Sequence, residues 1–158
     1  MSVAIIPRRR TQMKQTYSTQ KNITIKASAD KVWEALATPK IIKKYIFGAE
    51  VVSTWQKGDT VIYKSQWDGH PFEDKGTILE VAPKKILKLS FFSASSGLKD
   101  SPENHNLITY EIVSEKDGCT TLYVTQENNP SQSAADFAGE NWEMTLSQIK
   151  FLLENRQE

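Results

Sequence analysis

The chain has 158 residues, the usual length of one domain, and a domain of this size buries about 70% of the surface of its unfolded chain. Its 20 lysine and arginine residues nearly balance 19 aspartate and glutamate residues, and the net charge of +1 excludes a global field attracting nucleic acid, anionic membrane or acidic substrate. The single cysteine, Cys119, excludes an internal disulfide and Cys-rich metal sites, and no apolar run approaches the roughly 18 residues of a membrane-spanning helix. We therefore expect a cytoplasmic protein with no membrane span.

Residues 1–19 have no helical or strand periodicity and carry many polar and basic side chains, including three arginines at 8–10. This composition predicts a flexible basic N-terminal tail. The apolar run Ser2–Ile6 is too short for the core of a signal peptide. Met13 offers a second candidate translation start, so it stays open whether the preceding residues belong to the native protein.

Alternation of apolar and polar side chains over Lys21–Ala27 predicts the first strand. Ser28 is a suitable N-cap for a short helix that Pro39 ends. A second short helix follows over 40–47, with apolar side chains among lysines and Gly48 at its C-terminal end. Two interpretations of this second helix stay open, a lid or partner surface and a buried apolar face with a solvated basic back.

A series of strands with turns between them occupies the middle of the chain. Asp68-Gly69 is a strong hairpin pattern, Gly76 predicts a bulge or bend inside a strand, and the segment from Ser93 to Asn106 is rich in small and polar residues typical of a mobile loop. Residues 116–118 predict a further hairpin turn. The predicted strands cover 51–52, 61–67, 72–81, 86–92, 107–113 and 119–126.

The segment Ser131–Glu154 predicts a long C-terminal helix, with Ser131 as its N-cap. Its apolar residues recur at steps of three or four and form one stripe, which consists of Ala135, Ala138, Trp142, Leu146, Ile149 and Leu153. A stripe of this kind must cover an apolar surface. We therefore expect one α+β domain over 20–156, in which a curved antiparallel sheet of about six to seven strands wraps around the helix and two short helices follow the first strand.

Three motifs in this order resemble a known family. They are IKASADKVWEALATPKIIKKYIF at Ile25–Phe47, GTILEVAP at Gly76–Pro83 and WEMTLSQIKFLLE at Trp142–Glu154. The pattern is similar to that of the START or birch-pollen-allergen-like (SRPBCC, helix-grip) superfamily, and within it to the single-domain form of the family of activators of the heat-shock-protein-90 ATPase. The chain has Tyr45-Ile46-Phe47 where the family commonly has Trp-Phe, and Asn141 where it commonly has Gly. The resemblance implies a helix-grip fold, and it also implies a chaperone partner and a role in stress response.

A curved sheet that grips a helix leaves space between them, and the inward-facing candidates are mostly apolar or aromatic. Such spaces hold apolar small molecules by excluding water, while a few polar groups fix orientation. Tyr63, Tyr110 and Gln126 could supply those polar groups. The alternative is that all these side chains only fill the core. The cavity candidates are Tyr63, Trp67, Phe72, Phe91, Tyr110, Leu122, Val124, Phe137, Trp142 and Leu146, and Phe92 is the alternative to Phe91.

Patterns for catalysis or metal binding are weak. His70 and His105 lie beside loop-forming residues, where a lone histidine is usually solvated. Acidic residues around His70 at the 68–74 hairpin suggest a metal site, but Asp68 and Gly69 are needed for the turn itself. Cys119 follows Gly118 at the start of a strand, with no histidine or basic residue placed in the sequence to activate it, and we expect a structural thiol. We therefore expect no catalytic residue, no metal ligand and no cofactor.

Three classes of function remain, and we expect a binding protein more than an enzyme. The first is a binding protein for a hydrophobic or aromatic, lipid-like small molecule. The second is a co-chaperone or stress-response module that binds a protein. The third is an enzyme of the cyclase or dehydratase type found in the superfamily. We expect no nucleic-acid partner, and a monomer or a homodimer.

Overall fold

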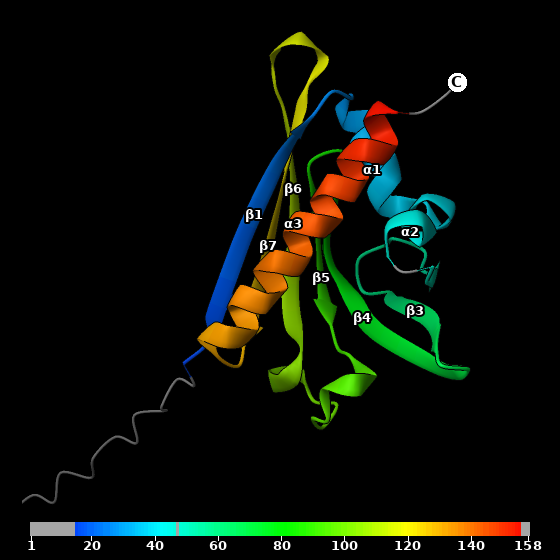
Figure 1. Ribbon diagram of the computed structural model, residues 1–158, viewed down its shortest axis with the longest axis vertical. Coiled ribbons are helices and arrows are strands. Elements are labelled where there is room, and N and C mark those ends of the chain that lie inside the picture. The colour runs from blue at the N-terminus through cyan, green and yellow to red at the C-terminus, as the bar shows by residue number, and fades with distance from the viewer. Residues whose placement is uncertain (1–14, 47, 156–158) are drawn as a thin grey trace, which may run out of the picture.

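The computed structural model describes residues 15–46 and 48–155, and for Trp67 its backbone only. Within this part of the chain, seven strands form one antiparallel sheet, and a long helix crosses its concave side (Figure 1). The elements in chain order are β1 (Tyr17–Ile25), α1 (Ala29–Ala37), α2 (Pro39–Tyr45), β2 (Glu50–Val52), β3 (Thr60–Trp67), β4 (His70–Ala82), β5 (Ile86–Phe91), β6 (Asn106–Ser114), β7 (Thr120–Asn129) and α3 (Gln132–Glu154). The predicted α+β helix-grip architecture is confirmed.

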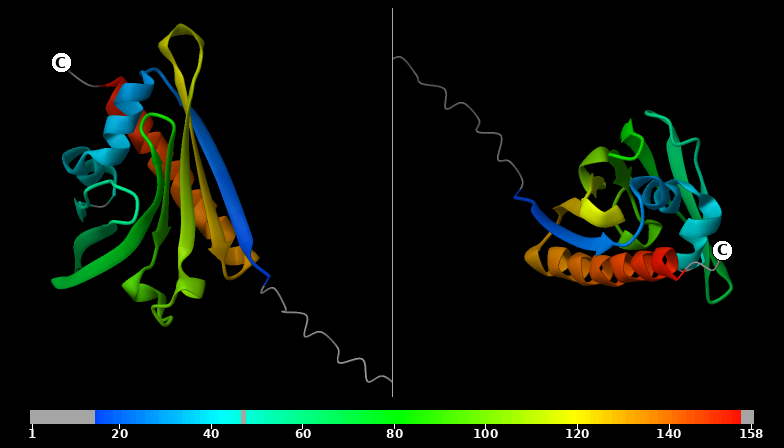
Figure 2. Two further views of the ribbon diagram at one scale, coloured as in Figure 1. Left: turned by 180° about the vertical axis from the view of Figure 1, so that it is seen from behind. Right: turned by 90° about the horizontal axis from the view of Figure 1, so that it is seen from above.

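The strand order in the sheet is β1-β7-β6-β5-β4-β3-β2, so β1 and β2 form its two edges. Each strand from β3 to β7 pairs with the strand that precedes it in the sequence, whereas β1 pairs with β7 from the far end of the sequence. The helix α3 lies mainly against β1 and less against β7, and α1 and α2 lie beside its C-terminal end (Figures 1 and 2). The concave side near the β3–β4 hairpin is therefore left without a covering helix.

The first strand begins earlier than the sequence predicted. Residues 17–19, expected in the tail, belong to β1, which pairs with β7 from Tyr17 opposite Asn129 onward. The alternation was hidden because the inward positions Thr19 and Lys21 are polar. They lie under Gly139 of α3, where an added Cβ would come within 2.8 Å of the Thr19 Oγ1 atom. The rest of the predicted tail, residues 1–14, lies outside the described residues.

Both predicted helix N-caps are confirmed. The hydroxyl of Ser28 accepts a hydrogen bond from the Lys31 amide at 3.3 Å, and that of Ser131 accepts one from the Ala134 amide at 3.0 Å. The first helix ends before Pro39 as expected, since α1 stops at Ala37, and Pro39 also begins α2. This agrees with the preference of proline for the first helical position, where its missing N–H costs nothing.

The turn predictions also have a clear outcome. Asp68 and Gly69 both have positive φ and close the β3–β4 hairpin, which pairs Trp67 with His70. Gly76 is needed for a close approach of β4 to β5, because a Cβ there would lie 1.8 Å from the Ser90 carbonyl oxygen. The irregularity predicted at Gly76 lies just beyond it, where the β4–β5 register shifts between Ile78 and Glu80.

The core lies between the sheet, α3 and the two short helices. Its fully buried members come from every layer, which shows that the helices and the sheet share one core. The largest are Ile25, Val32, Ile42, Val61, Ile78, Leu87, Leu89, Leu122, Val124, Leu146 and Ile149. Among the described residues, no helix is both long enough and apolar enough to cross a bilayer.

Candidate functional site

Two aromatic pairs lie on the concave side of the sheet. Tyr63 of β3 meets Phe91 of β5 edge-on, with ring centroids 5.7 Å apart, and Tyr110 of β6 meets Trp142 of α3 edge-on at 5.7 Å. Tyr63, Phe91 and Trp142 are half-buried, whereas Tyr110 is buried. The alternation of strand side chains places them on the same face as the core residues Leu87, Leu89 and Val124. We call Tyr63, Phe91, Tyr110 and Trp142 the aromatic site.

The phenols of this region differ in their hydrogen bonding. Tyr45 of α2 donates to the Ala35 carbonyl at 2.6 Å and so joins α2 to α1. No hydrogen bond joins the hydroxyl of Tyr63 or Tyr110 to another residue of 15–46 or 48–155. Both hydroxyls are therefore donors that the described part of the chain does not use.

Burial keeps these phenols neutral. It raises the pKa of Tyr110 well above the usual value, with smaller effects from Tyr45 and Tyr63. Burial also raises the pKa of Tyr63, and the nearby Asp74 carboxylate adds to the effect. At physiological pH each group therefore presents an O–H, which donates a hydrogen bond and carries no charge.

Side-chain hydrogen bonds of two amide residues of β7 link α3 to the sheet. The Trp142 indole N–H donates to Gln126 Oε1 at 2.8 Å, and Gln126 Nε2 donates to Asn129 Oδ1, also at 2.8 Å. Asn129 is 2% exposed and donates in turn to the carbonyls of Tyr17 and Gln126. Both ends of the Gln126 amide are therefore occupied, and this residue ties α3 to β7 and β1 instead of offering polar groups to a ligand.

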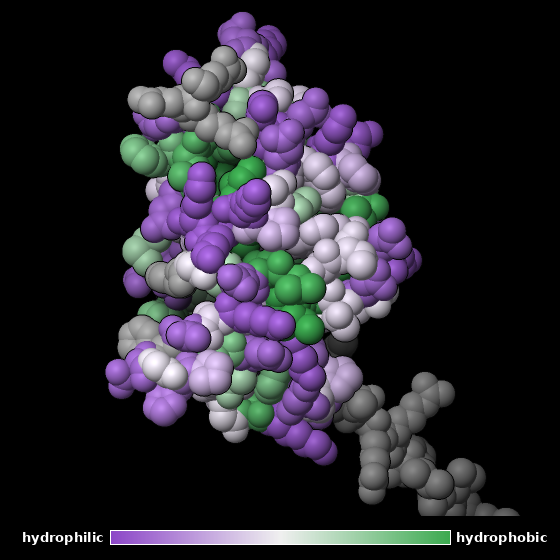
Figure 3. Space-filling view, turned by 90° about the vertical axis from the view of Figure 1, so that its right-hand side faces the viewer, coloured by the Kyte–Doolittle hydropathy of each residue, from purple (hydrophilic) through white to green (hydrophobic). Residues whose placement is uncertain are grey.

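An open groove of about 540 Å³ lies beside the β3–β4 hairpin. Phe72 and Ser65 contribute to it from positions directly opposite each other in the two strands, and Ser65 follows Tyr63 at the same face of β3. The groove is lined by Gly48, Glu50, Lys64, Ser65, Gln66, Pro71, Phe72 and Glu73. Viewed from the side of α2 and β3, the surface is mainly polar, with hydrophobic side chains in small separate groups (Figure 3). Its other strand residues, such as Lys64, Gln66 and Glu73, occupy the alternate positions on the opposite face, so only Ser65 and Phe72 connect this groove to the face that carries Tyr63.

The structure separates the predicted cavity residues into groups. Buried in the core are Tyr110, Leu122, Val124 and Leu146. Half-buried are Tyr63, Phe72, Phe91 and Trp142. The inward orientation expected of Phe137 is wrong, because its side chain is 66% exposed on the outer side of α3, one residue before the buried Ala138. The side chain of Trp67 lies outside what the structure describes, and contact of any of these residues with a ligand stays a prediction.

The two histidines lie outside the aromatic site. His105 Nε2 contacts Asp100 Oδ1 at 2.7 Å and its ring stacks on Phe92, while Lys75 also pairs with Asp100. These contacts join the loop residues Asp100 and His105 to Lys75 of β4. His70 is exposed at the hairpin. Among the described residues, no group of three or more His, Cys, Asp or Glu side chains is arranged to hold a metal ion.

Three residues have roles in this region that the sequence analysis did not predict. Asp74 accepts from the Ala94 amide at 3.1 Å and lies beside Tyr63. Tyr45 and Asn129 form the hydrogen bonds described above. The Asn-Asn pair directly before Pro130 was the available indication for Asn129, since buried asparagine at a strand end usually bonds the backbone.

Comparisons with known proteins were consistent with this architecture. The family model for Activator of Hsp90 ATPase homolog 1-like protein matches residues 26–154. The solution structure of ChR145 from Cytophaga hutchinsonii is 40% identical, with a TM-score of 0.78, and the match covers 88% of this chain and 94% of that one. No curated protein matches the chain.

More distant structures share the fold alone. The Aha1 dimer from Colwellia psychrerythraea is 19% identical with a TM-score of 0.69, over 90% of this chain and 99% of that one. DynU16, a putative protein in the dynemicin biosynthetic locus, is 16% identical with a TM-score of 0.71. That match covers 87% of this chain and 47% of DynU16.

Proposed function

We propose that this chain, which belongs to the family of Activator of Hsp90 ATPase homolog 1-like proteins, binds an apolar or aromatic small molecule at the aromatic site. The observation that carries the proposal is the pair of phenol hydroxyls, on Tyr63 and Tyr110, that donate to no described residue. Their rings each contact a second aromatic ring, and neither hydroxyl is sealed off from solvent, so a ligand can reach them. A ligand with an oxygen acceptor on a flat apolar body suits this arrangement.

The charge pattern of the site favours a neutral ligand. The phenols stay protonated and carry no charge. The Asp74 carboxylate beside Tyr63 disfavours an anionic ligand at that end of the site. The groove at the β3–β4 hairpin offers a route of entry, because its Ser65 and Phe72 adjoin Tyr63.

The direct test uses prodan, a neutral solvatochromic naphthalene with a ketone acceptor. We expect saturable one-to-one binding with a blue shift of prodan emission. Tyr63→Phe and Tyr110→Phe each remove one hydroxyl and little volume, and each should weaken binding about 2- to 10-fold, the value of one neutral hydrogen bond.

The matched control is Tyr123→Phe. Tyr123 lies between the buried Leu122 and Val124 of β7 and so points to the opposite face of the sheet. This variant should bind prodan as the wild type does. Failure of prodan to saturate, or equal weakening by all three variants, would refute the proposal.

A chaperone partner is the alternative that the family name implies, and it makes a different prediction. Binding to a chaperone should be unchanged by Tyr63→Phe and Tyr110→Phe, since both side chains lie on the concave side of the sheet and are at least half-buried. We further propose a cytoplasmic location, which the lone, free and partly buried Cys119 supports.

A further inference from the structure

Three large apolar side chains lie exposed along one line of α3. Phe137 and Phe151 are each 66% exposed, and Met144 is 56% exposed. They are spaced seven residues apart, and because an α-helix turns 100° per residue, each is offset by about 20° from the next and the two phenylalanines by about 40°. We call Phe137, Met144 and Phe151 the α3 stripe, and it lies on the side of α3 away from the sheet.

The α3 stripe exposes a sizeable apolar area. A fully exposed side chain of this size offers roughly 200 Å², so the three together leave on the order of 350 Å² of apolar surface in one line. The largest apolar patch on a typical monomer covers about 300–600 Å² and is often functional, so this line of exposed apolar side chains is a candidate interaction site.

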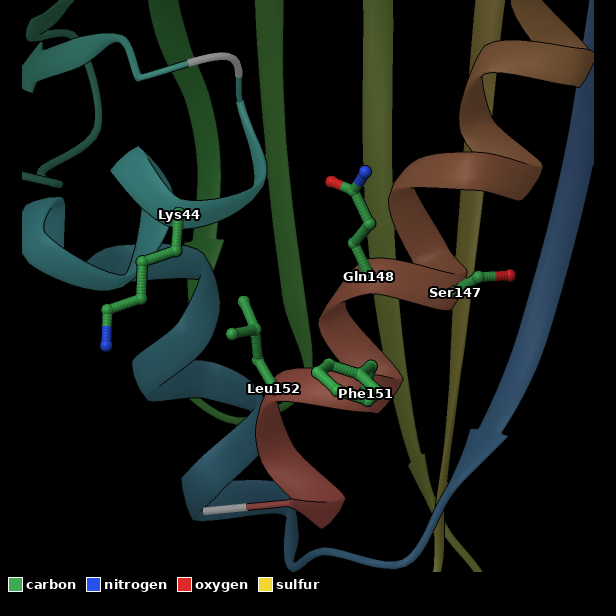
Figure 4. A pocket seen from close by; sticks show the side chains of 5 residues that line it. All are labelled: Lys44, Ser147, Gln148, Phe151 and Leu152. Carbon is green, nitrogen blue, oxygen red and sulfur yellow. The ribbon is translucent and has the colours of Figure 1, made fainter. Parts of the chain in front are cut away.

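A groove lies at one end of the stripe. It has a volume of about 260 Å³ and lies between α2 and the last turns of α3, with Phe151 at its rim (Figure 4). Leu152 and Gln148 lie on the side of α3 nearer to α2, and Lys44 lines the groove from α2, with its amino group directed away from α3. A cavity of about 150 Å³ is enough to hold a benzene ring, so this groove has room for one phenylalanine side chain.

We infer that the α3 stripe is the contact surface of a homodimer, in which α3 of a second copy lies antiparallel with Met144 on the two-fold axis. The stripe is symmetric about Met144, with an aromatic residue seven positions away on each side. In an antiparallel pair centred there, Phe137 of one chain lies at the height of Phe151 of the second copy. Phe137 is offset by about 20° from Met144, toward the side of α3 that carries Gln148 and Leu152. In the dimer its ring therefore enters the groove of the second copy, beside Lys44.

The polar residues that flank the stripe are compatible with this pairing. Glu140 and Ser147 form a row on one side, and Asn141 and Gln148 form a row on the other. Two-fold symmetry brings each row against its own copy in reverse, so that Glu140 meets Ser147 and Asn141 meets Gln148. Each contact joins groups that can share a hydrogen bond, and none opposes two like charges.

These features favour a second copy over an unrelated partner. A two-fold contact requires a surface that is complementary to itself, and here the knob, Phe137, and the groove lie at equal distances from Met144. The stripe and its flanking rows together reach roughly the lower limit of a specific interface, about 1,200 Å² in total. We therefore expect a dissociation constant in the micromolar range. This inference does not rest on the proposed ligand.

Sedimentation velocity of the full chain from about 1 µM to 1 mM tests the dimer. We expect a concentration-dependent species of twice the monomer mass. Met144→Lys places two ammonium groups together on the axis and should weaken association at least 10-fold, with an unchanged circular dichroism spectrum because the residue is exposed. The matched control is Leu98→Lys, which adds the same charge at a side chain 50% exposed in a loop.

A charge-pairing experiment tests the antiparallel register. Phe137→Glu alone and Phe151→Lys alone should each associate weakly, whereas a mixture of the two should form the heterodimer, in which the introduced charges face each other. A wild type that stays monomeric at 1 mM overturns the inference. So does a dimer that Met144→Lys leaves intact, and a mixture that associates no better than its components overturns the antiparallel register.

Discussion

Trp142 holds α3 against the sheet through an indole hydrogen bond and a contact with the Tyr110 ring. Two substitutions of Trp142 should separate these contributions to the free energy of unfolding. Trp142→Phe keeps an aromatic ring near Tyr110 but removes the indole N–H that donates to Gln126 Oε1 at 2.8 Å. A net hydrogen bond is worth about 1 kcal/mol, and the smaller ring leaves some space unfilled. We therefore expect a loss of about 1–2 kcal/mol in the free energy of unfolding.

Trp142→Ala removes the ring as well. The edge-on contact with Tyr110 is worth about 0.5–1.5 kcal/mol beyond burial, so the total loss should reach about 3 kcal/mol for this half-buried side chain. Urea denaturation gives the free energy, provided the slope of the transition does not change.

A double-mutant cycle isolates the hydrogen bond. Gln126→Met keeps the length of the side chain but removes both hydrogen bonds of its amide group. The free-energy losses of Gln126→Met and Trp142→Phe should show a coupling energy of about 1 kcal/mol. Additive losses, or a Trp142→Phe loss below about 0.3 kcal/mol, would show that the indole does not hold α3 in place.

Three further predictions concern single contacts, and all are measured by urea denaturation. Gly76→Ala should cost about 3 kcal/mol or more because its Cβ would meet the Ser90 backbone carbonyl, which cannot move aside; a loss below about 1 kcal/mol would contradict the close approach. Ser131→Ala should cost about 1 kcal/mol and Ser131→Gly only a few tenths, so equal losses would argue against the cap. The pKa of Asp100 is lowered by Lys75 and then by His105, so this carboxylate stabilises the fold above its unfolded pKa of about 3.9, and the stabilisation is lost as pH falls through the lower folded pKa. Asp100→Asn should therefore be less stable than the wild type at pH 6 and equal to it at about pH 2, and a difference independent of pH would refute this.

The long helix and the turns were predictable because their determinants are local. The stripe of α3, the hydroxyl of Ser131 and the Asp68-Gly69 turn act within a few residues of chain. The start of β1 was not predictable in this way. Its inward residues are polar, and its partner strand lies about a hundred residues later in the sequence.

The candidate site was predictable only in part. Strand alternation indicated which aromatic residues face inward, but it could not tell a core residue such as Leu122 from a half-buried one such as Phe91. Phe137 was misplaced because it is apolar and close in sequence to the buried stripe, whereas the helix turns it outward. The role of Gln126 depends on an indole 16 residues away, which no short pattern reveals.

The central claim is that the unused phenols of Tyr63 and Tyr110 meet a ligand on the concave side of the sheet. The most direct measurement is an NMR titration with prodan of protein isotope-labelled at the tyrosine ζ carbons. We predict that the Tyr63 and Tyr110 signals shift together and saturate, while that of Tyr123 stays fixed. A titration that moves neither inner signal, or moves Tyr123 as much as them, would contradict the claim.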